Sequence, residues 1–484
     1  MASKRPNLLC FSSITVSEPI ITGPSAKSDI ILTKLDGTTI RFPLIIKYAN
    51  NLHQVHLPLL KLAFCIPLLN YGLFSKKLRL HFTIDESDLC LLTKMNVVFS
   101  RDIYVNKILR RRANYILSEF LLNENKVTPK DATPVATIEP SKVTTNHRLT
   151  KEMNNHRCGI LSSSGKESLL TYGLLEEMNA EVYPLYVNES GGHWRTALSA
   201  YRYHKNNNQN TQRVWTNVDR FYNFMLDHLR FIRPDHRKIR ADTYPLRLCI
   251  FPFYIFILLP IFIEKKIGNL LIGSEFDDQR SIPTYNGITH YYGVYDQHQD
   301  YDVLMNEWYS KKIPGLYQWS AVRNISGLIV ERILVSRYPH IAKYQRSCHS
   351  CHFENSKIFP CGTCSKCLGV LLFLLANKVN PTIMNFGEND VYSFKKRVDF
   401  SSLRLDQDEK EHSFFLLRNT GTFPQGQQVD HVEQIHVNKM TCDPSLIPAQ
   451  FKEKLLKIIE KYTNGYCTLE GDTWVPYEKT LVTY

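Results

Sequence analysis

The chain has 484 residues, of which 43% are hydrophobic, so it is long enough and apolar enough for two or three packed domains. Its formal net charge of +13 is compatible with RNA as a partner. The basic residues are dispersed, however, so a solvated basic surface is the simpler interpretation and RNA is the minority one. The twelve cysteines argue against a disulfide framework, because five lie between positions 348 and 367 and the others are scattered.

The N-terminal region lacks the apolar core of a signal peptide, so we expect a cytoplasmic, reducing location. One apolar stretch, residues 248–263, is a candidate membrane span. It has 16 residues and two prolines, whereas a span needs about 20 apolar residues. A buried core helix is therefore favoured, and we expect no membrane partner.

Residues 1–125 indicate a separate α+β domain. Residues 30–42 predict a hairpin around an Asp36–Gly37 turn, and apolar helical stretches follow near 57–69 and 104–122. Residues 126–156 are polar and contain three prolines, which is typical of a linker.

From 157 to 390, strand-like and helical patterns alternate, which predicts an α/β fold with a doubly wound parallel sheet. Residues 391–484 read as a polar C-terminal extension that ends in short strand-like pieces. Strands are expected at 158–161, 181–187, 212–217, 269–273 and 317–322, and helices at 166–178, 193–203, 219–230, 246–263, 302–311 and 326–337.

The first of these strands leads into a turn rich in hydrogen-bond donors, residues 163–168, called here the 163–168 loop. Leu170, Leu174 and Met178 then fall on one helical face. Hydroxyls, backbone N–H groups and a lysine at a helix N-terminus suit phosphate. A Walker loop is excluded by the spacing. An ordinary serine-rich helix cap is the alternative. The loop reads Ser163, Ser164, Gly165, Lys166, Glu167 and Ser168.

The 163–168 loop resembles the Ser-Gly-Gly-x-Asp-Ser loop of the PP-loop ATP pyrophosphatases, a superfamily with a HUP-like fold. Ser164 stands where that family has glycine, and Glu167 where it has aspartate. The resemblance covers residues 157–390. It implies an enzyme that cleaves ATP between the α and β phosphates, with Lys166, Glu167 and Ser168 in catalytic roles and the loop residues binding ATP.

The clustered cysteines form CxxC, a spacer and CxxCxxC, which is a strong signal for a metal, either zinc or an iron–sulfur cluster. The pattern is similar to the four-cysteine zinc site of the 7-cyano-7-deazaguanine synthases. That match implies Cys348, Cys361, Cys364 and Cys367 as ligands, with Cys351 as the extra thiol. The flanking segments also resemble the ATP-dependent epimerase that acts on a UDP-muramoyl dipeptide.

Other polar residues follow the expected strands. Gly273 and Glu275 are assigned to the ATP site, and the adjacent Asp277 and Asp278 to Mg²⁺. By resemblance to the deazaguanine synthases, Arg247 is a candidate for phosphate, with a salt bridge to Asp242 as the alternative. The loop after the second expected strand contains Glu189, His193 and Arg195. We expect these side chains to bind an acidic substrate. A solvated loop that caps the next helix is the alternative.

These features predict an enzyme that uses ATP, Mg²⁺ and structural Zn²⁺. A carboxylate of a small acidic substrate, or alternatively a carbonyl oxygen, would attack the α-phosphorus of ATP and release pyrophosphate, and a nucleophile would then displace AMP. Two alternatives stay open. One is a tRNA-modifying PP-loop enzyme, and the other is a non-catalytic, zinc-containing nucleotide-binding or interaction protein.

Overall fold

The computed structural model describes residues 7–110, 114–145, 152–239, 246–278, 280–398, 401, 403–418, 423 and 425–478. The chain divides into two compact units. Unit 1 comprises residues 1–153, 213–266 and 281–316, and unit 2 comprises residues 154–212, 267–280 and 317–484. Residues 213–266 and 281–316, which the sequence placed in the second domain, thus belong to unit 1.

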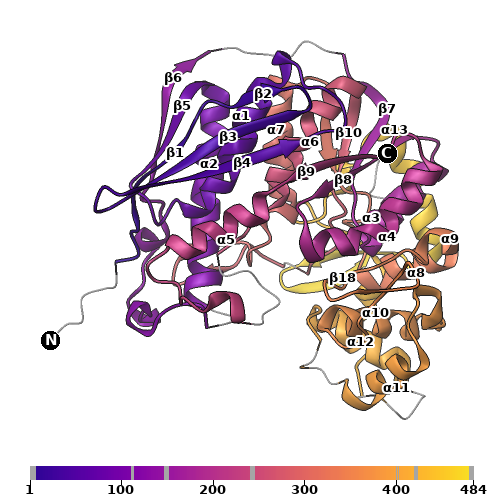
Figure 1. Cartoon of the computed structure of the whole chain (residues 1–484). Helices are drawn as coiled ribbons and strands as arrows, with labels where there is room; N and C mark the ends of the chain where they lie inside the picture. The colour runs from indigo at the N-terminus through magenta and orange to yellow at the C-terminus, as the bar shows by residue number, and fades with distance from the viewer. Residues whose placement is uncertain are drawn as a thin grey trace. The chain divides into compact units, whose positions relative to one another are not determined.

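Unit 1 contains a mixed sheet in the order β9-β4-β3-β1-β5-β6, in which β1, β5 and β6 run parallel and the other pairs are antiparallel (Figure 1). Its strands are β1 (Phe11–Val16), β2 (Ile20–Thr22), β3 (Ser25–Lys34), β4 (Thr39–Lys47), β5 (Lys77–Asp85), β6 (Thr137–Thr144), β9 (Gln212–Thr216), β11 (Thr284–Tyr285) and β12 (Ile288–Thr289). Its α-helices are α1 (Leu57–Cys65), α2 (Glu86–Ile103), α5 (Val218–His228), α6 (Phe251–Lys265) and α7 (Gln299–Lys312).

The expected hairpin is confirmed, because β3 and β4 pair across the Asp36–Gly37 turn, where Gly37 has a φ of +89°. The apolar stretch forms the buried helix α6, as expected. Two expectations are wrong. The region expected as a linker contains β6, which pairs with β5. Within the described part of 104–122, the expected long helix is instead a short π-helix over Tyr104–Leu109, which continues α2, and a single 3-10 turn over Ser118–Phe120.

Unit 2 contains a parallel sheet in the order β13-β10-β7-β8, which confirms an α/β fold with a parallel sheet. Every residue of β10 is buried, as expected for an inner parallel strand. Its strands are β7 (Asn154–Leu161), β8 (Glu181–Asn188), β10 (Ile267–Leu271), β13 (Tyr317–Trp319), β14 (His352–Glu354), β15 (Lys357–Phe359), β16 (Ile435–Val437), β17 (Tyr466–Glu470) and β18 (Thr473–Tyr477).

The α-helices of unit 2 carry one apolar face each toward a common core. They are α3 (Lys166–Glu177), α4 (Gly191–Asn207), α8 (Gly327–Arg337), α9 (Pro339–Ala342), α10 (Ser365–Ala376), α11 (Glu388–Arg397), α12 (Gln407–Leu417) and α13 (Ala449–Ile459). The C-terminal segment belongs to this core. Phe451 of α13 stacks on the buried Trp319 of β13, with ring centroids 5.6 Å apart, so residues expected as a polar extension contribute to the core of the unit.

The strand order of unit 2 creates a topological switch point. The chain passes from β7 to β8 on one side, and later adds β10 and β13 on the other side of β7. The connections that leave β7 and β10 therefore diverge, and ligands of open α/β sheets bind at the carboxyl ends of strands at such a point.

Candidate functional site

The 163–168 loop lies at this switch point, where it follows the end of β7 and includes the first turn of α3. The hydroxyls of Ser163 and Ser168 form hydrogen bonds within the loop. Ser163 Oγ accepts a hydrogen bond from Gly165 N at 3.0 Å, and Ser168 Oγ accepts one from Ser163 N at 3.2 Å. The two hydroxyl oxygens are 3.2 Å apart. The expected strand, turn and helix are all observed, and Leu170, Leu174 and Met178 are buried.

Ser164 faces the protein interior and not the open side of the loop. It is fully buried and its Oγ accepts a hydrogen bond from Ala200 N of α4 at 3.0 Å. Ser164 has no positive φ, so the glycine of the resembled motif is not needed here to relieve a left-handed backbone. The side chain at 164 thus leaves the loop backbone unobstructed.

Lys166 connects the 163–168 loop to the segment after β10. Its Nζ lies 2.6 Å from Glu167 Oε1 and 2.8 Å from Glu275 Oε2. Gly273 permits this approach, because a Cβ at that position would lie 2.8 Å from the Cβ of Glu167. The structure therefore brings together two segments that the sequence assigned independently to one ATP site.

Two further glutamates surround Lys166, and sequence reasoning missed both. Glu409 of α12 accepts a hydrogen bond from Leu328 N at 2.9 Å. Glu331 of α8 is fully buried. Gln345 Nε2 donates to its Oε2 at 2.9 Å, and its Oε1 has no hydrogen-bond partner among the described residues. The glutamates lie on helices that the sequence places far from the loop, so no local pattern marks them.

Burial and the repulsion between neighbouring carboxylates determine the pKa values of the glutamates around Lys166. Burial, with the charges of Glu167 and Glu409, raises the pKa of Glu275 to about 8 against the opposing charge of Lys166. Although 30% of the Glu275 side chain is exposed, its Oε2 is shielded from solvent. Burial also raises the pKa values of Glu331 and Glu409 to about 7. Burial opposes the charged form of Lys166, but Glu167 and Glu275 hold its pKa above the usual range.

This lysine–glutamate cluster, defined as Lys166, Glu167, Glu275, Glu331 and Glu409, has more acids than bases. Carboxylate oxygens are ligands that Mg²⁺ prefers, and an ammonium group binds phosphate. Acids with pKa values near neutral can also take up or release a proton at physiological pH. The acids of the cluster can therefore transfer a proton, and Lys166 can pair with an anionic group.

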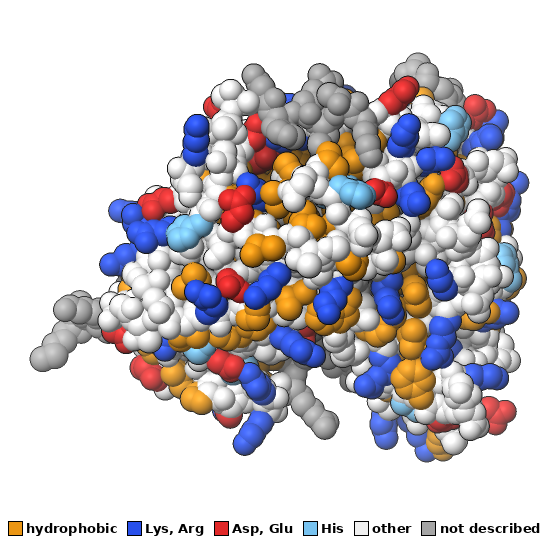
Figure 2. Space-filling view, turned by 45° about the horizontal axis from the view of Figure 1, so that its top comes forward, with side chains coloured by type: hydrophobic (Ala, Val, Ile, Leu, Met, Phe, Trp, Pro, Cys, Tyr) orange, Lys and Arg blue, Asp and Glu red, His pale blue; other side chains and the backbone are white. Residues whose placement is uncertain are grey.

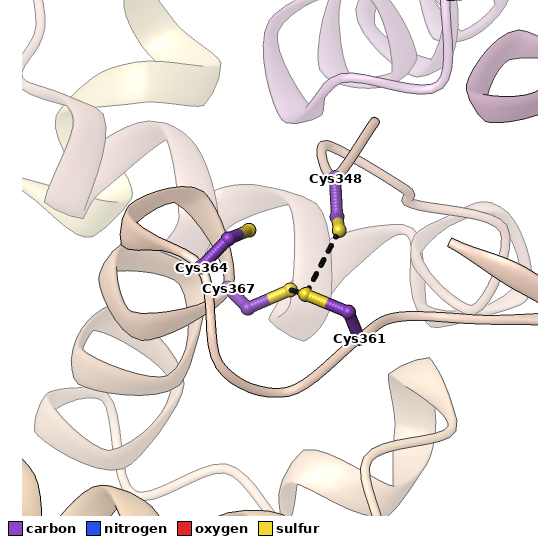
Figure 3. Close-up of side chains that lie close together, drawn as sticks. All are labelled: Cys348, Cys361, Cys364 and Cys367. Atoms are coloured by element: carbon purple, nitrogen blue, oxygen red, sulfur yellow. Dashed lines mark hydrogen bonds between the residues drawn. The ribbon is translucent and has the colours of Figure 1, made fainter. Parts of the chain in front are cut away.

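Four cysteines form a candidate metal centre in the same unit (Figure 3). The sulfur atoms of Cys348, Cys361, Cys364 and Cys367 all lie within 4.8 Å of one another. The Cys361–Cys367 sulfur distance is 3.8 Å, and the Cys348–Cys361 distance is 3.2 Å. A tetrahedron with Zn–S bonds of about 2.3 Å has edges of about 3.8 Å. The donor set and its spacing therefore fit zinc.

The backbone around these cysteines is shaped by turns. Asn355 and Ser356 both have positive φ and join β14 to β15 in a tight hairpin. Gly362 has a φ of +71°, and a Cβ there would lie 2.0 Å from Asp390 Oδ1. Cys364 is the N-cap of α10. Thiol–thiol hydrogen bonds, the one from Cys348 foremost, lower the pKa of Cys364, and the same network raises the pKa values of Cys348 and Cys367.

Cys351, the fifth cysteine, is outside the four-sulfur group. It is buried and its sulfur lies 4.0 Å from Thr196 Oγ1 on α4. The residues expected to bind an acidic substrate lie beside this segment. Arg195 Nη1 donates to Cys351 O at 3.3 Å, and the His193 ring is 4.2 Å from the His349 ring. The buried Glu189 lies 3.7 Å from His193.

Asp277 and Asp278, the residues expected to bind Mg²⁺, differ in their exposure and contacts. Asp277 is exposed. Asp278 accepts a hydrogen bond from Trp474 Nε1 at 2.8 Å and pairs with Arg280 at 2.9 Å. Ligand atoms of Asp278, Asp408 and His431 also lie within 4.8 Å of one another. Arg280 pairs with both aspartates, so a cation would compete with a guanidinium for the same oxygens.

Arg247 belongs to unit 1. Its Nη1 lies 3.2 Å from Asp219 Oδ1, and its Nη2 donates to Tyr254 OH at 3.1 Å. It is buried and lies over the ring of Tyr222. The alternative partner, Asp242, lies outside the described residues.

No protein-family model, no curated protein and no solved structure matches the chain. Within the described part of the chain, no helix has the length and apolar character needed to cross a bilayer. On the face drawn in Figure 2, lysine and arginine side chains are spread among uncharged ones and not gathered in a single block.

Proposed function

We propose that the protein is an ATP-dependent adenylating enzyme whose active site is the 163–168 loop with the lysine–glutamate cluster. The observation that carries the proposal is the pairing of Lys166 with Glu275 at the switch point between β7 and β10. A lysine and carboxylates at the carboxyl ends of these strands, beside the N-terminus of α3, suit a metal-bound triphosphate.

In the proposed reaction, a substrate carboxylate oxygen bonds to the α-phosphorus as the bond to the β-phosphate oxygen breaks. Pyrophosphate leaves with that electron pair. Lys166 and the N–H groups at the start of α3 stabilise its charge, and Glu167 and Glu275 would hold Mg²⁺, which neutralises phosphate oxygens. A nucleophile then attacks the acyl carbon and AMP leaves. Glu331 or Glu409, with a pKa near 7, would accept the proton that the nucleophile loses.

The experiment is pyrophosphate and AMP release from ATP and Mg²⁺, with and without a metabolite extract. Lys166→Ala and Ser168→Ala are compared with Lys457→Ala, which removes an exposed lysine from α13 of the same unit. Products that need the extract, persist in the control and disappear in both loop variants would support adenylation.

Binding of ATP is measured in parallel by equilibrium dialysis. Binding that Lys166→Ala abolishes, without pyrophosphate under any extract, would indicate the non-catalytic nucleotide-binding alternative. Wild-type protein that binds no ATP would refute the proposal. Product release that Lys166→Ala leaves unchanged would place the chemistry elsewhere.

A further inference from the structure

Six exposed cations of unit 2 lie on α4 and on the segment that carries the β14–β15 hairpin. None of them forms an ion pair with a carboxylate within the described part of the chain. Other cations of the unit are neutralised, as Arg157 is by Glu181. We call residues 191–207 and 343–367 the α4–hairpin surface. Its six exposed cations are Arg195, Arg202, Lys205, Lys343, Lys357 and Lys366.

Contacts between α4 and the hairpin bring these side chains together. Arg202 Nη1 donates to Ser356 O at 3.0 Å, in the turn between β14 and β15. Lys357 follows Ser356 in the chain, and Lys205 lies one helical turn beyond Arg202. Arg195 precedes Arg202 by two turns, which places both on the same face of α4.

The remaining two cations border the same surface. Lys366 Nζ lies 3.1 Å from Nε2 of His349, whose ring contacts α4. Lys343 Nζ lies 5.2 Å from the ring centroid of Tyr344, and this ring stacks on Tyr203 of α4 at 4.6 Å. The six cations therefore line one continuous part of unit 2.

The α4–hairpin surface contains almost no acid. Its two segments have seven Lys or Arg residues and one Glu, which gives a net formal charge of +6, whereas the whole chain carries +13. The single acid, Glu354, lies 2.8 Å from His352 Nε2. The cations are dispersed in the sequence, and only the fold gathers them. An excess of positive charge attracts a polyanion.

An exposed aromatic ring lies among these cations. Phe353 is 48% exposed, and every residue of β14 is exposed. The guanidinium carbon of Arg202 lies 5.8 Å from the centroid of the Phe353 ring. A nucleic acid strand carries a flat base beside each phosphate, so a base can stack on this ring while the cations bind the backbone. An acidic peptide would match the charges but not the ring.

We propose that the α4–hairpin surface binds single-stranded RNA, with its cations on phosphates and Phe353 stacked on a base. A base must be unstacked to reach Phe353, and RNA presents such bases in its loops and ends, whereas a duplex keeps them stacked. The same segments hold the 163–168 loop, because Ser164 accepts hydrogen bonds from Ala200 N and Arg346 N. RNA binding at this surface does not depend on ATP chemistry.

Fluorescence anisotropy of the full-length protein with a labelled, mixed-sequence RNA of about 16 nucleotides is the first measurement. The test variant combines Lys205→Gln with Lys357→Gln. Each phosphate contact contributes about 0.7 to the slope of log K against log salt for a single strand. We therefore expect a slope shallower by about 1.4, and binding about 25-fold weaker at about 0.1 M salt.

The matched control combines Lys454→Gln with Lys457→Gln. Both lysines are exposed on α13, which packs against β13, whereas α4 packs against β8 at the other edge of the sheet. The control removes the same charge from the same unit, and salt screens it from the α4–hairpin surface, so affinity should change by less than about twofold. A test variant that loses no more affinity than this control would overturn the proposal.

Phe353→Ala tests the stacking contact separately from the charges. It should weaken binding about tenfold without changing the salt slope, and Phe353→Trp should retain the affinity. Binding by Phe353→Ala that equals wild type would contradict the stacking role and overturn the proposal.

The class of partner is tested with wild-type protein. Single-stranded DNA of the same sequence, duplex RNA and a polyglutamate peptide should all bind more weakly than single-stranded RNA. Polyglutamate that binds as tightly would overturn the proposal in favour of an acidic protein partner. Equal affinity for DNA or for the duplex would overturn the assignment to single-stranded RNA, and so would the absence of RNA binding at about 50 mM salt.

Hydrogen exchange of wild-type protein locates the contact and needs no variant. Addition of RNA should slow exchange in peptides that cover α4, β14 and β15, and should leave peptides from α13 unchanged. Protection confined to other segments would overturn the proposal, even if a variant failed to fold.

Discussion

Replacement of Lys166 by methionine should destabilise unit 2 in a pH-dependent manner. Lys166 is the cation of the lysine–glutamate cluster, and its side chain is 11% exposed. Loss of one partner from a buried ion pair costs about 3–5 kcal/mol. Because 30% of the Glu275 side chain is exposed, solvent screening reduces that figure, and we expect about 2–3 kcal/mol at pH 8.5.

The pH dependence follows from the raised acid pKa values. Glu275 and Glu409, with folded pKa values of about 8 and about 7 against an ordinary 4.5, bind protons more tightly in the folded state. Such groups contribute stability below about pH 4.5 and lose it as the pH rises through 7 to 8. Without Lys166 their pKa values rise further, so the cost of the substitution should fall to about 1 kcal/mol at pH 5.5, where both acids are protonated.

The assay is hydrogen exchange of α3 and α8 peptides, which reports the opening free energy of unit 2 alone. Lys166→Met with Glu275→Gln should recover most of the loss at pH 8.5, because the unpaired charge is removed. Lys457→Met, at an exposed position, is the control and should change little. A cost that is equal at the two pH values, or no recovery in the double variant, would refute this electrostatic account.

Three further predictions concern other parts of unit 2. Glu331→Gln should stabilise the unit by about 1–2 kcal/mol at pH 8.5 but not at pH 5, because burial raises the pKa of Glu331 to about 7; the same exchange assay measures it. Gly362→Ala should speed zinc loss to a chelator severalfold, since its φ is +71° and a Cβ would lie 2.0 Å from Asp390 Oδ1. Phe451→Ala should cost about 3–5 kcal/mol in urea unfolding, because a buried ring stacked on Trp319 is lost.

Sequence reasoning succeeded where a local pattern specified the structure. A strand-like run at 158–161 predicted the end of β7, the serine- and glycine-rich stretch predicted the turn, and helical spacing predicted α3 with the buried face of Leu170 and Leu174. It failed where strands paired outside their neighbourhood. The polar residues 137–144 form β6 because β5 supplies hydrogen-bond partners, and propensity alone does not reveal that pairing.

By itself, the sequence determined which residues are able to bind a metal, because the spacing of cysteines in two turns is a local property of the chain. It also determined that Lys166 stands at the start of a helix after a strand. Only the tertiary structure decided that Ser164 faces inward, that Glu331 and Glu409 lie near Lys166, and that Arg346 N donates to Ser164 O of the 163–168 loop. These contacts join residues from distant parts of the chain, and their energies depend on burial, which exists only once the core has packed.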